Sequence, residues 1–331
     1  MSRLVFVTQE VDPAHPFLAA TVGKIEALAS RYDEVAVLAA RAVPGVLPEN
    51  CSVVLYGAGS RASRGGRYVA SLGYELRRRP QAVLVHMVPL LAVLAAPFAK
   101  AHRVPLLLWF THWKRSRTLV LADRLADAVL TVNARSFPLA SRKVVPIGHG
   151  VDLRRFPCAT RESGARLRVL ALGRTSPAKG YETILRAARL ADVDLELRGP
   201  SSTAIERAER ARLEALGARI EEPVPYADVP ALLFGKDVLV NNMREGALDK
   251  VVYEAAATCM PVLASNSGFD DLLPPQLRFA RTDHEQLADR LRSLKDADRG
   301  EIGRALRAVV EERHSAAHWA DEVVRVAGSV R

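Results

Sequence analysis

The residues best suited to chemistry lie in residues 244–266, "REGALDKVVYEAAATCMPVLASN", where a polar turn leads into an apolar helix. Four residues of the turn could contact a ligand: Glu245, Gly246, Asp249 and Lys250. Asp249 can cap the helix, and Lys250 shares a helical face with Glu254, four residues later. An acid on an otherwise apolar helix needs a partner, such as the two hydroxyls of a ribose. A capped helix with a solvated Lys–Glu pair is the alternative interpretation.

A second candidate site is the loop "LGRTSPAKGYETIL" at residues 172–185. Arg174 and Lys179 lie between an expected strand, 167–173, and a helix that begins near Gly180. Two cations beside the N-terminus of a helix suit a diphosphate. An ordinary loop with solvated basic residues is the alternative. The spacing matches neither the phosphate loop of nucleotide hydrolases nor Gly-x-Gly-x-x-Gly.

The first half of the chain offers two further candidate positions. The expected strand 104–110 leads to His112, which could bond a sugar hydroxyl or transfer a proton, or could be a structural histidine. The segment after the expected strand 3–8 carries Gln9, Asp12 and His15 but no glycine. A dinucleotide-binding turn is therefore excluded there, because pyrophosphate could not approach the backbone. Neither half has the glycine fingerprint of an oxidoreductase.

Short apolar runs alternate with helical patterns along the whole chain, which predicts an α/β fold with parallel sheets covered on both faces. The expected strands of the first half are 3–8, 34–40, 51–57, 82–87, 104–110, 127–132 and 143–148. Those of the second half are 167–173, 193–199, a short strand near "ARIEE", 237–242 and the "PVLAS" run. Three helical segments are expected after about residue 284.

A polar stretch with Gly and Pro, residues 150–168, marks a boundary between two Rossmann-like domains. We expect an N-terminal acceptor-binding domain at 1–155 and a nucleotide-sugar-binding domain at 156–312. Residues 313–331 should form a helix that crosses back to the first domain. The two parallel sheets should face each other across a cleft, with ligands beyond the carboxyl ends of their strands.

The positive charge of the chain is confined to its first half. Residues 1–150 contain 19 Lys and Arg against 9 Asp and Glu, whereas residues 151–331 contain 28 of each. The segment 60–80 predicts a helix with Val69, Leu72 and Leu76 on one face and six arginines around it: Arg61, Arg64, Arg67, Arg77, Arg78 and Arg79. Such a helix can lie on an anionic membrane, and a solvated basic face is the alternative.

The cysteines and the apolar runs of the chain limit the cellular compartments in which the protein is expected. Cys51, Cys158 and Cys259 lie far apart and form no Cys-x-x-Cys pair, so neither a disulfide framework nor a zinc site is expected. A reducing cytosol is the predicted compartment. The N-terminus does not have the pattern of a signal peptide, and the longest apolar run, 87–99, is too short to span a bilayer.

Four stretches, taken in order, resemble family 4 of the retaining, nucleotide-sugar-dependent glycosyltransferases, which have the GT-B fold. "IGHGVDLRRF" is similar to the family's interdomain segment, with His149 where Asn is usual. "GRTSPAKG" resembles its phosphate loop, and "PVPYADVPALLFGKDVLV" its base-binding region. "EGALDKVVYEAAATCMPVLAS" resembles its donor helix, but Glu245 and Glu254 are separated by eight residues instead of seven. The glycine-rich loop often found after the first strand is missing.

The resemblance implies a role for each candidate residue. Arg174 and Lys179 would hold the donor diphosphate and stabilise its departure without a metal or other cofactor. Glu254 would bind the ribose, the backbone near Val224 the base, and His112 the donor sugar. The turn with Glu245, Gly246, Asp249 and Lys250 would approach the donor. Gln9, Asp12 and His15 would face the acceptor.

The predicted function is transfer of a sugar from a UDP- or GDP-sugar to a glycan, a lipid-linked or a small-molecule acceptor, with retention of anomeric configuration. The predicted location is cytoplasmic, with peripheral contact to the inner face of an anionic membrane; nucleic acid is not an expected partner. A sugar-nucleotide epimerase of the same fold is one alternative. A non-catalytic binder of anionic lipid or nucleic acid is the other, and it would not explain the phosphate and ribose pattern in the neutral second half.

Overall fold

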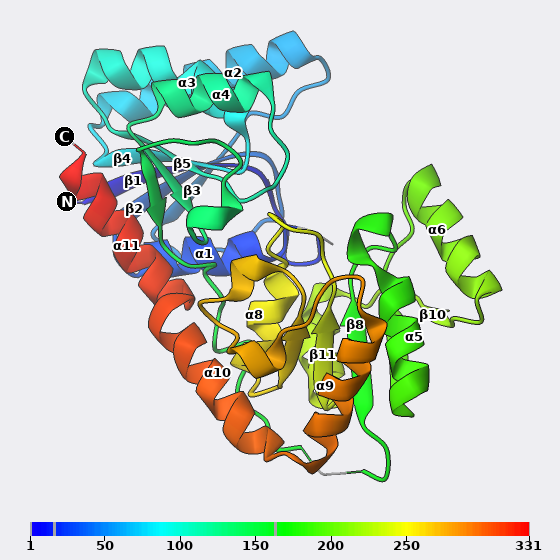
Figure 1. Ribbon diagram of the computed structural model, residues 1–331. Coiled ribbons are helices and arrows are strands. Elements are labelled where there is room, and N and C mark those ends of the chain that lie inside the picture. Colours follow the sequence, from blue (N-terminus) through cyan, green and yellow to red (C-terminus); the bar gives the residue numbers. More distant parts are fainter. Residues whose placement is uncertain (1, 16–17, 162–163, 331) are drawn as a thin grey trace. The chain divides into compact units, whose positions relative to one another are not determined.

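A computed structural model describes residues 2–15, 18–161 and 164–330 of the chain (Figure 1). The chain forms two compact units. The first consists of Met1–Asp152 with Arg313–Arg331, and the second of Leu153–Glu312. Each unit contains one parallel sheet with helices packed on it, so the prediction of an α/β fold with two Rossmann-like parts is confirmed.

The first sheet has the strand order β3-β2-β1-β4-β5-β6-β7, and all neighbouring strands are parallel. Its strands are β1 (Arg3–Val11), β2 (Glu34–Ala42), β3 (Cys51–Leu55), β4 (Ala82–His86), β5 (Leu106–Trp109), β6 (Ala128–Thr131) and β7 (Val144–Pro146). Every residue of β4, β5 and β6 is buried. Strands covered on both faces are nearly continuous apolar runs, here interrupted only by His86 and Thr131 at strand ends, which is why they are recognisable in the sequence.

Helices cover both faces of the first sheet. They are α1 (Ala20–Ala29), α2 (Arg61–Arg77), α3 (Pro89–His102), α4 (Arg117–Leu125) and α11 (Ala316–Ser329). Helices α2, α3 and α4 lie side by side on one face, and α1 packs with α11 on the other (Figure 1). The sheet therefore has the doubly wound arrangement, in which ligands bind where the strand order reverses.

The second sheet has five parallel strands in the order β10-β9-β8-β11-β12. Its strands are β8 (Arg168–Leu172), β9 (Asp194–Arg198), β10 (Ile220–Glu221), β11 (Val238–Asn241) and β12 (Val262–Ala264). Its helices are α5 (Tyr181–Ala191), α6 (Ala204–Ala215), α7 (Val229–Phe234), α8 (Lys250–Ala257), α9 (His284–Asp296) and α10 (Arg299–Arg313). The order reverses at β8, so the loops after β8 and β11 are neighbours.

Strand β1 extends further than the sequence predicts. The expected strand ends at Thr8, but β1 continues to Val11, which pairs with Ala42 of β2. Gln9 and Glu10 are therefore strand residues and not part of a loop. The sequence does not indicate this continuation, because Gln9 and Glu10 are polar residues whose side chains are at least partly exposed at the carboxyl end of the strand.

Helix α2 does not present its apolar side to a surface. Leu72 and Leu76 are fully buried, and the Tyr68 hydroxyl donates to the Leu91 carbonyl, 3.0 Å away. The apolar residues assigned to membrane contact thus pack in the core of the first unit. Membrane contact through this helix would have to use its arginines.

Helix α11 belongs to the first unit and packs on α1. The Trp319 and Trp109 rings meet edge to face at 5.5 Å, and the Lys24 ammonium lies 4.3 Å from the Trp109 ring. Arg31 of the segment after α1 pairs with Asp321 at 2.5 Å. The C-terminal helix is thus held by aromatic packing and by an ion pair within this unit.

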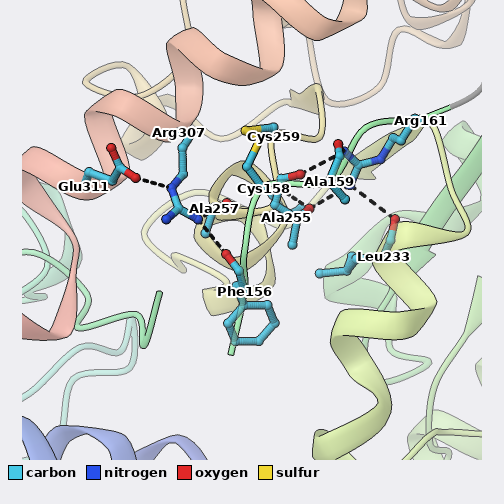
Figure 2. Close-up of a disulfide and its surroundings, with 11 residues drawn as sticks. Phe156, Cys158, Ala159, Arg161, Leu233, Ala255, Ala257, Cys259, Arg307 and Glu311 are labelled. Carbon is cyan, nitrogen blue, oxygen red and sulfur yellow. Dashed lines mark hydrogen bonds and ion pairs between the residues drawn. A yellow bond between two sulfur atoms is a disulfide. The ribbon is translucent and has the colours of Figure 1, made fainter. Parts of the chain in front are cut away.

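The expectation that the cysteines are unpaired is wrong, because Cys158 and Cys259 form a disulfide (Figure 2). The bond joins residues 101 positions apart, both in the second unit. Spacing along the sequence does not show which distant residues the fold brings together. The pairing also removes the cysteine-based argument for a reducing compartment. Cys51 remains a free thiol.

Among the described residues, no helix is both long enough and apolar enough to cross a bilayer.

Candidate functional site

Lys179 is the more deeply buried of the two cations in the loop after β8. Its side chain is only 9% exposed, and its ammonium donates to the Leu172 carbonyl at 3.1 Å and to Asp249 at 2.7 Å. Gly173 makes this position possible, because a Cβ there would lie 2.3 Å from the Lys179 nitrogen. The loop thus brings a buried ammonium to the carboxyl end of the second sheet.

The start of α5 is held by close backbone contacts. Gly180 has φ +57°, and a Cβ there would lie 2.4 Å from the side-chain nitrogen of Asn242. Asn242 donates to the Gly180 carbonyl at 2.9 Å. Glycine is required both for the left-handed backbone and for the close approach.

Arg174 has different contacts from Lys179. Its guanidinium is 54% exposed and bonds Glu206 of α6 at 3.4 Å. The two cations of the loop therefore have different settings: Lys179 is fixed by Asp249, and Arg174 is directed to the first turn of a neighbouring helix.

Asp249 occupies the N-cap position of α8 but does not act as predicted. Within the described residues its side chain makes no capping bond to the helix. It instead accepts from Lys179 and from the side-chain amide of Asn241, both at 2.7 Å. The attraction of a nearby ammonium outweighs that of a main-chain N–H, because charge-assisted bonds are the stronger ones. Asp249 therefore joins the loops after β8 and β11.

Glu254 is buried and has two partners. Its side chain is 4% exposed, and one oxygen accepts from the Tyr226 hydroxyl and the Lys250 ammonium, both at 2.7 Å. The Lys250 ammonium also lies 3.8 Å from the Tyr226 ring. The three side chains form a compact cluster, which we call the Tyr226–Lys250–Glu254 cluster.

Burial perturbs the charge of this cluster. Loss of solvation lowers the pKa of Lys250 below the usual lysine value of 10.5, and Arg155 acts in the same direction. The Glu254 carboxylate opposes this shift. Lys250 therefore loses its proton more readily than a surface lysine does.

The turn before α8 has its own contacts. Glu245 is exposed and accepts from the main-chain N–H of Ser267 at 2.9 Å and from its hydroxyl at 2.8 Å. Gly246 has φ +78°, which a side chain would strain. Arg244 donates from its backbone to the Ala178 carbonyl, so this turn lies against the loop after β8.

Val224 is partly buried and lies just before the short helix η3 (Tyr226–Asp228). Tyr226, two residues later, carries the hydrogen bond to Glu254 and packs on the Phe156 ring at 6.1 Å. The expected base-binding segment is thus adjacent to the acid expected to bind ribose.

His112 belongs to the first unit and follows β5. It is exposed, its Nδ1 accepts from the Lys114 backbone at 2.9 Å, and its ring stacks on Trp113 at 5.5 Å. It is not a buried structural histidine.

The three candidate acceptor residues lie near the carboxyl end of β1. Gln9 and His15 line a cavity of about 880 Å³ in the first unit. Asp12 accepts from the backbone of Ala14 at 2.8 Å and so shapes the turn between them.

Sequence reasoning missed several residues that hold the second-unit site together. Asn241 ends β11 and donates to Asp249, Asn242 follows it and donates to the Gly180 carbonyl, and Tyr226 donates to Glu254. Arg281 donates to the carbonyls of Ala178 and Asn242. Two adjacent asparagines at the carboxyl end of a buried strand are a sequence signal that predicts a polar site there. Arg281 left no such signal.

Over the ranges 2–15, 18–161 and 164–330, no group of three or more His, Cys, Asp or Glu side chains is placed to hold a metal ion. The cations described above are the charged groups available to an anionic ligand. Metal independence stays a prediction.

Residues 174–325 match a protein family described as glycosyl transferase-like. The match covers the second-unit candidates from Arg174 to Glu254. No curated protein matches the chain.

Solved structures establish the GT-B fold. Anabaena Alr3699/HepE in complex with UDP-glucose has a TM-score of 0.77 and 17% identity, and the match covers 99% of this chain and 100% of that one. Sucrose-phosphate synthase from Thermosynechococcus elongatus has a TM-score of 0.74 and 17% identity, with 100% and 99% covered. The UDP-GlcNAc 2-epimerase from Methanocaldococcus jannaschii has a TM-score of 0.60 and 12% identity, with 99% and 100% covered. Transferases and an epimerase therefore share this architecture, and the reaction must be argued from the site.

Proposed function

We propose that this protein is a glycosyltransferase that moves a sugar from a nucleotide-sugar donor to an acceptor. One observation carries the proposal: a buried ammonium, Lys179, and the Tyr226–Lys250–Glu254 cluster both lie at the carboxyl end of the second sheet. Cations suit a diphosphate, and a buried carboxylate suits the two hydroxyls of a ribose. The match of residues 174–325 to a glycosyl transferase-like family supports the same assignment.

Lys179 is prepared for an anion by the bonds it already makes. An ammonium has three donors, and the Leu172 carbonyl and Asp249 take two of them. The remaining donor can reach a phosphate oxygen without the side chain having to reorganise. Such fixed charges stabilise the negative charge that develops on a departing diphosphate.

Glu254 would exchange partners when a donor binds. In the structure one of its oxygens accepts from both Tyr226 and Lys250. The two hydroxyls of a ribose would donate to the Glu254 carboxylate and release the Lys250 ammonium toward the diphosphate. The cluster thus keeps a buried acid satisfied until the nucleotide arrives.

The finer details of the reaction belong to the proposal as well. By resemblance, the configuration at the anomeric carbon is retained, no metal is needed, and His112 contacts the sugar that is transferred. Arg174 would add a second cation at the phosphates, Val224 a backbone contact to the base, and a UDP- or GDP-sugar is the donor we expect. The Anabaena neighbour in complex with UDP-glucose supports a uridine nucleotide.

Calorimetric titration with UDP, GDP, ADP and dTDP tests the donor site. We expect one nucleotide to bind, with affinity unchanged by EDTA. The change Glu254→Ala should reduce that affinity by two decades or more, because it removes a buried charge and leaves Lys250 and Tyr226 without it. Failure of all four nucleotides to bind would overturn the donor-site assignment.

A cytoplasmic location with peripheral contact to an anionic membrane is part of the same proposal. Residues 51–150 carry 15 Lys and Arg against 3 Asp and Glu, and six arginines lie on or beside α2. Because the apolar face of α2 is buried, the attraction would be electrostatic and lost in salt. Vesicles of phosphatidylglycerol should sediment the protein at low salt, and failure to do so rejects the membrane contact.

A sugar-nucleotide epimerase is the second candidate, favoured by the similarity to the Methanocaldococcus jannaschii enzyme. An epimerase converts the nucleotide sugar without an acceptor, whereas a transferase releases the nucleoside diphosphate. Product analysis with the bound nucleotide sugar, with and without acceptors, separates the two reactions.

A further inference from the structure

The cavity of the first unit lies where the strand order of its sheet reverses. Its lining comes from the carboxyl ends of β1, β2 and β3, from α2, and from the start of α3. Strands β2 and β4 lie on opposite sides of β1, so the loops at this point diverge and leave a hollow. Its volume, about 880 Å³, is that of a small-molecule site.

Part of the lining of the cavity is apolar. Tyr56 and Leu91 are almost fully buried in its wall, whereas Leu55 and Leu90 are more than half exposed at its edge. Exposed leucines at the rim of a hollow are unfavourable in water unless something covers them. These residues therefore suit an apolar part of a ligand.

Another part of the lining is basic. Arg41, Arg64 and Arg67 line it against one carboxylate, Glu10. Arg41 pairs with Glu10 at 2.9 Å, so that carboxylate is already neutralised. Among the described residues, Arg64 and Arg67 make no ion pair.

The two unpaired arginines are held at the cavity by main-chain oxygens. Arg67 donates to the Gly57 carbonyl at 3.0 Å and Arg64 to the Ala58 carbonyl at 3.3 Å. The loop that carries these oxygens lies close against β2, because a Cβ on Gly57 would lie 2.2 Å from the Ala40 carbonyl oxygen. Each guanidinium has five donors, so most remain for a ligand.

We propose that this cavity binds an acceptor that carries an anionic group, a phosphate or a carboxylate, next to an apolar portion. Arg64 and Arg67 would bind the anionic group, and the leucines and Tyr56 would cover the apolar portion. The role as acceptor site rests on the proposed glycosyltransferase function, whereas the binding chemistry does not. An uncharged sugar acceptor would provide no counter-charge for these two guanidinium groups.

The test compares three soluble probes that share an eight-carbon chain: n-octyl phosphate, octanoate and n-octyl β-glucoside, each below its micelle concentration. Calorimetry should show that an anionic probe binds at least roughly tenfold more tightly than the glucoside, because a charge-assisted hydrogen bond is worth about a decade in affinity. Octyl phosphate and octanoate separate phosphate from carboxylate as the preferred group.

Two double variants locate the binding. Arg64→Gln with Arg67→Gln should remove the preference for the anionic probe. Arg61→Gln with Arg77→Gln changes the net charge equally on the same helix, outside the cavity lining, and should keep it. All four positions are exposed, so both variants should fold, as circular dichroism can verify.

Equal binding of the anionic probe and the glucoside, or an equal loss in both double variants, would overturn the proposal. Nucleotide titration of the same proteins keeps the two proposals distinct. If no nucleotide binds, the donor site in the second unit is rejected. The anion preference of this cavity is tested separately, by titration with the three eight-carbon probes.

Discussion

Lys250 is the residue whose chemistry depends most on its surroundings. Its ammonium touches Glu254 and the Tyr226 ring, and burial lowers its pKa. A lysine with a lowered pKa loses its positive charge as the pH rises through that value, at a pH below 10.5. The positive charge that should bind phosphate is therefore lost at a lower pH than the charge of a surface lysine.

Nucleotide affinity should accordingly fall as the pH is raised through the lowered pKa of Lys250. The expected loss is roughly tenfold, the worth of one charge-assisted hydrogen bond. Lys250→Arg keeps the charge at alkaline pH and should abolish the fall. Calorimetry from pH 7 to pH 10 measures the nucleotide affinity of both proteins. If the affinity of the arginine variant fell with pH as much as that of the wild type, the assignment would be contradicted.

The sequence identified the residue types of the second-unit site better than their partners. Lys179 and Glu254 are recognisable in the sequence because a loop and the start of a helix place charge just after an expected strand. Asp249 was expected to cap α8, but its partner Lys179 is 70 residues away in the chain. Local capping rules cannot include a competitor supplied by tertiary structure.

At the scale of elements, each of the twelve strands within the described ranges coincides with an expected one. The fully buried strands are the clearest in the sequence, because buried parallel strands are nearly continuous apolar runs. The ends of strands were less certain, as β1 shows, because polar residues at an exposed edge resemble a loop. The basic helix at 60–80 was also recognised, but its apolar residues were assigned to a membrane. Helical periodicity shows which residues share a face but not what covers that face.

The loop between β8 and α5 depends on Gly173. Its φ of +139° is rarely open to side chains, and a Cβ would lie 2.3 Å from the Lys179 nitrogen. Gly173→Ala should displace Lys179 and weaken nucleotide binding by tenfold or more. It should also cost about 1–3 kcal/mol in unfolding free energy.

Gly235→Ala is the matched control, because Gly235 lies in the same unit, has φ −75° and leaves ordinary space for a Cβ. Thermal unfolding and calorimetry should show little change there. Equal effects of the two substitutions would mean that the loop does not position Lys179.

At the scale of the whole molecule, the disulfide and two arginines hold the end of α8 (Figure 2). Arg307 donates to the carbonyls of Phe156 and Ala257, and Arg161 donates to Thr258. Burial lowers the pKa of Arg161 to about 10. The chain before β8 and the last turn of α8 are thus joined by covalent and polar links.

Replacing both bridged cysteines, Cys158→Ser with Cys259→Ser, should lower the unfolding free energy by about 4–5 kcal/mol. That is the value expected for a cross-link that closes a loop of about 100 residues. Urea unfolding measures the change, and Cys51→Ser serves as the control because Cys51 is free. Equal stability of the double variant and the wild type would show that the bridge does not form.

The same bridge makes residues 158–259 a closed covalent ring. Every second-unit candidate for donor binding, from Arg174 to Glu254, lies within that ring. A protease that cuts once inside the ring opens it but releases neither fragment. On a denaturing gel without reductant, the cleaved chain should therefore remain a single species of full mass, and a reductant should separate it into two fragments. The part of the molecule that would handle the nucleotide is therefore the part that a single break cannot divide.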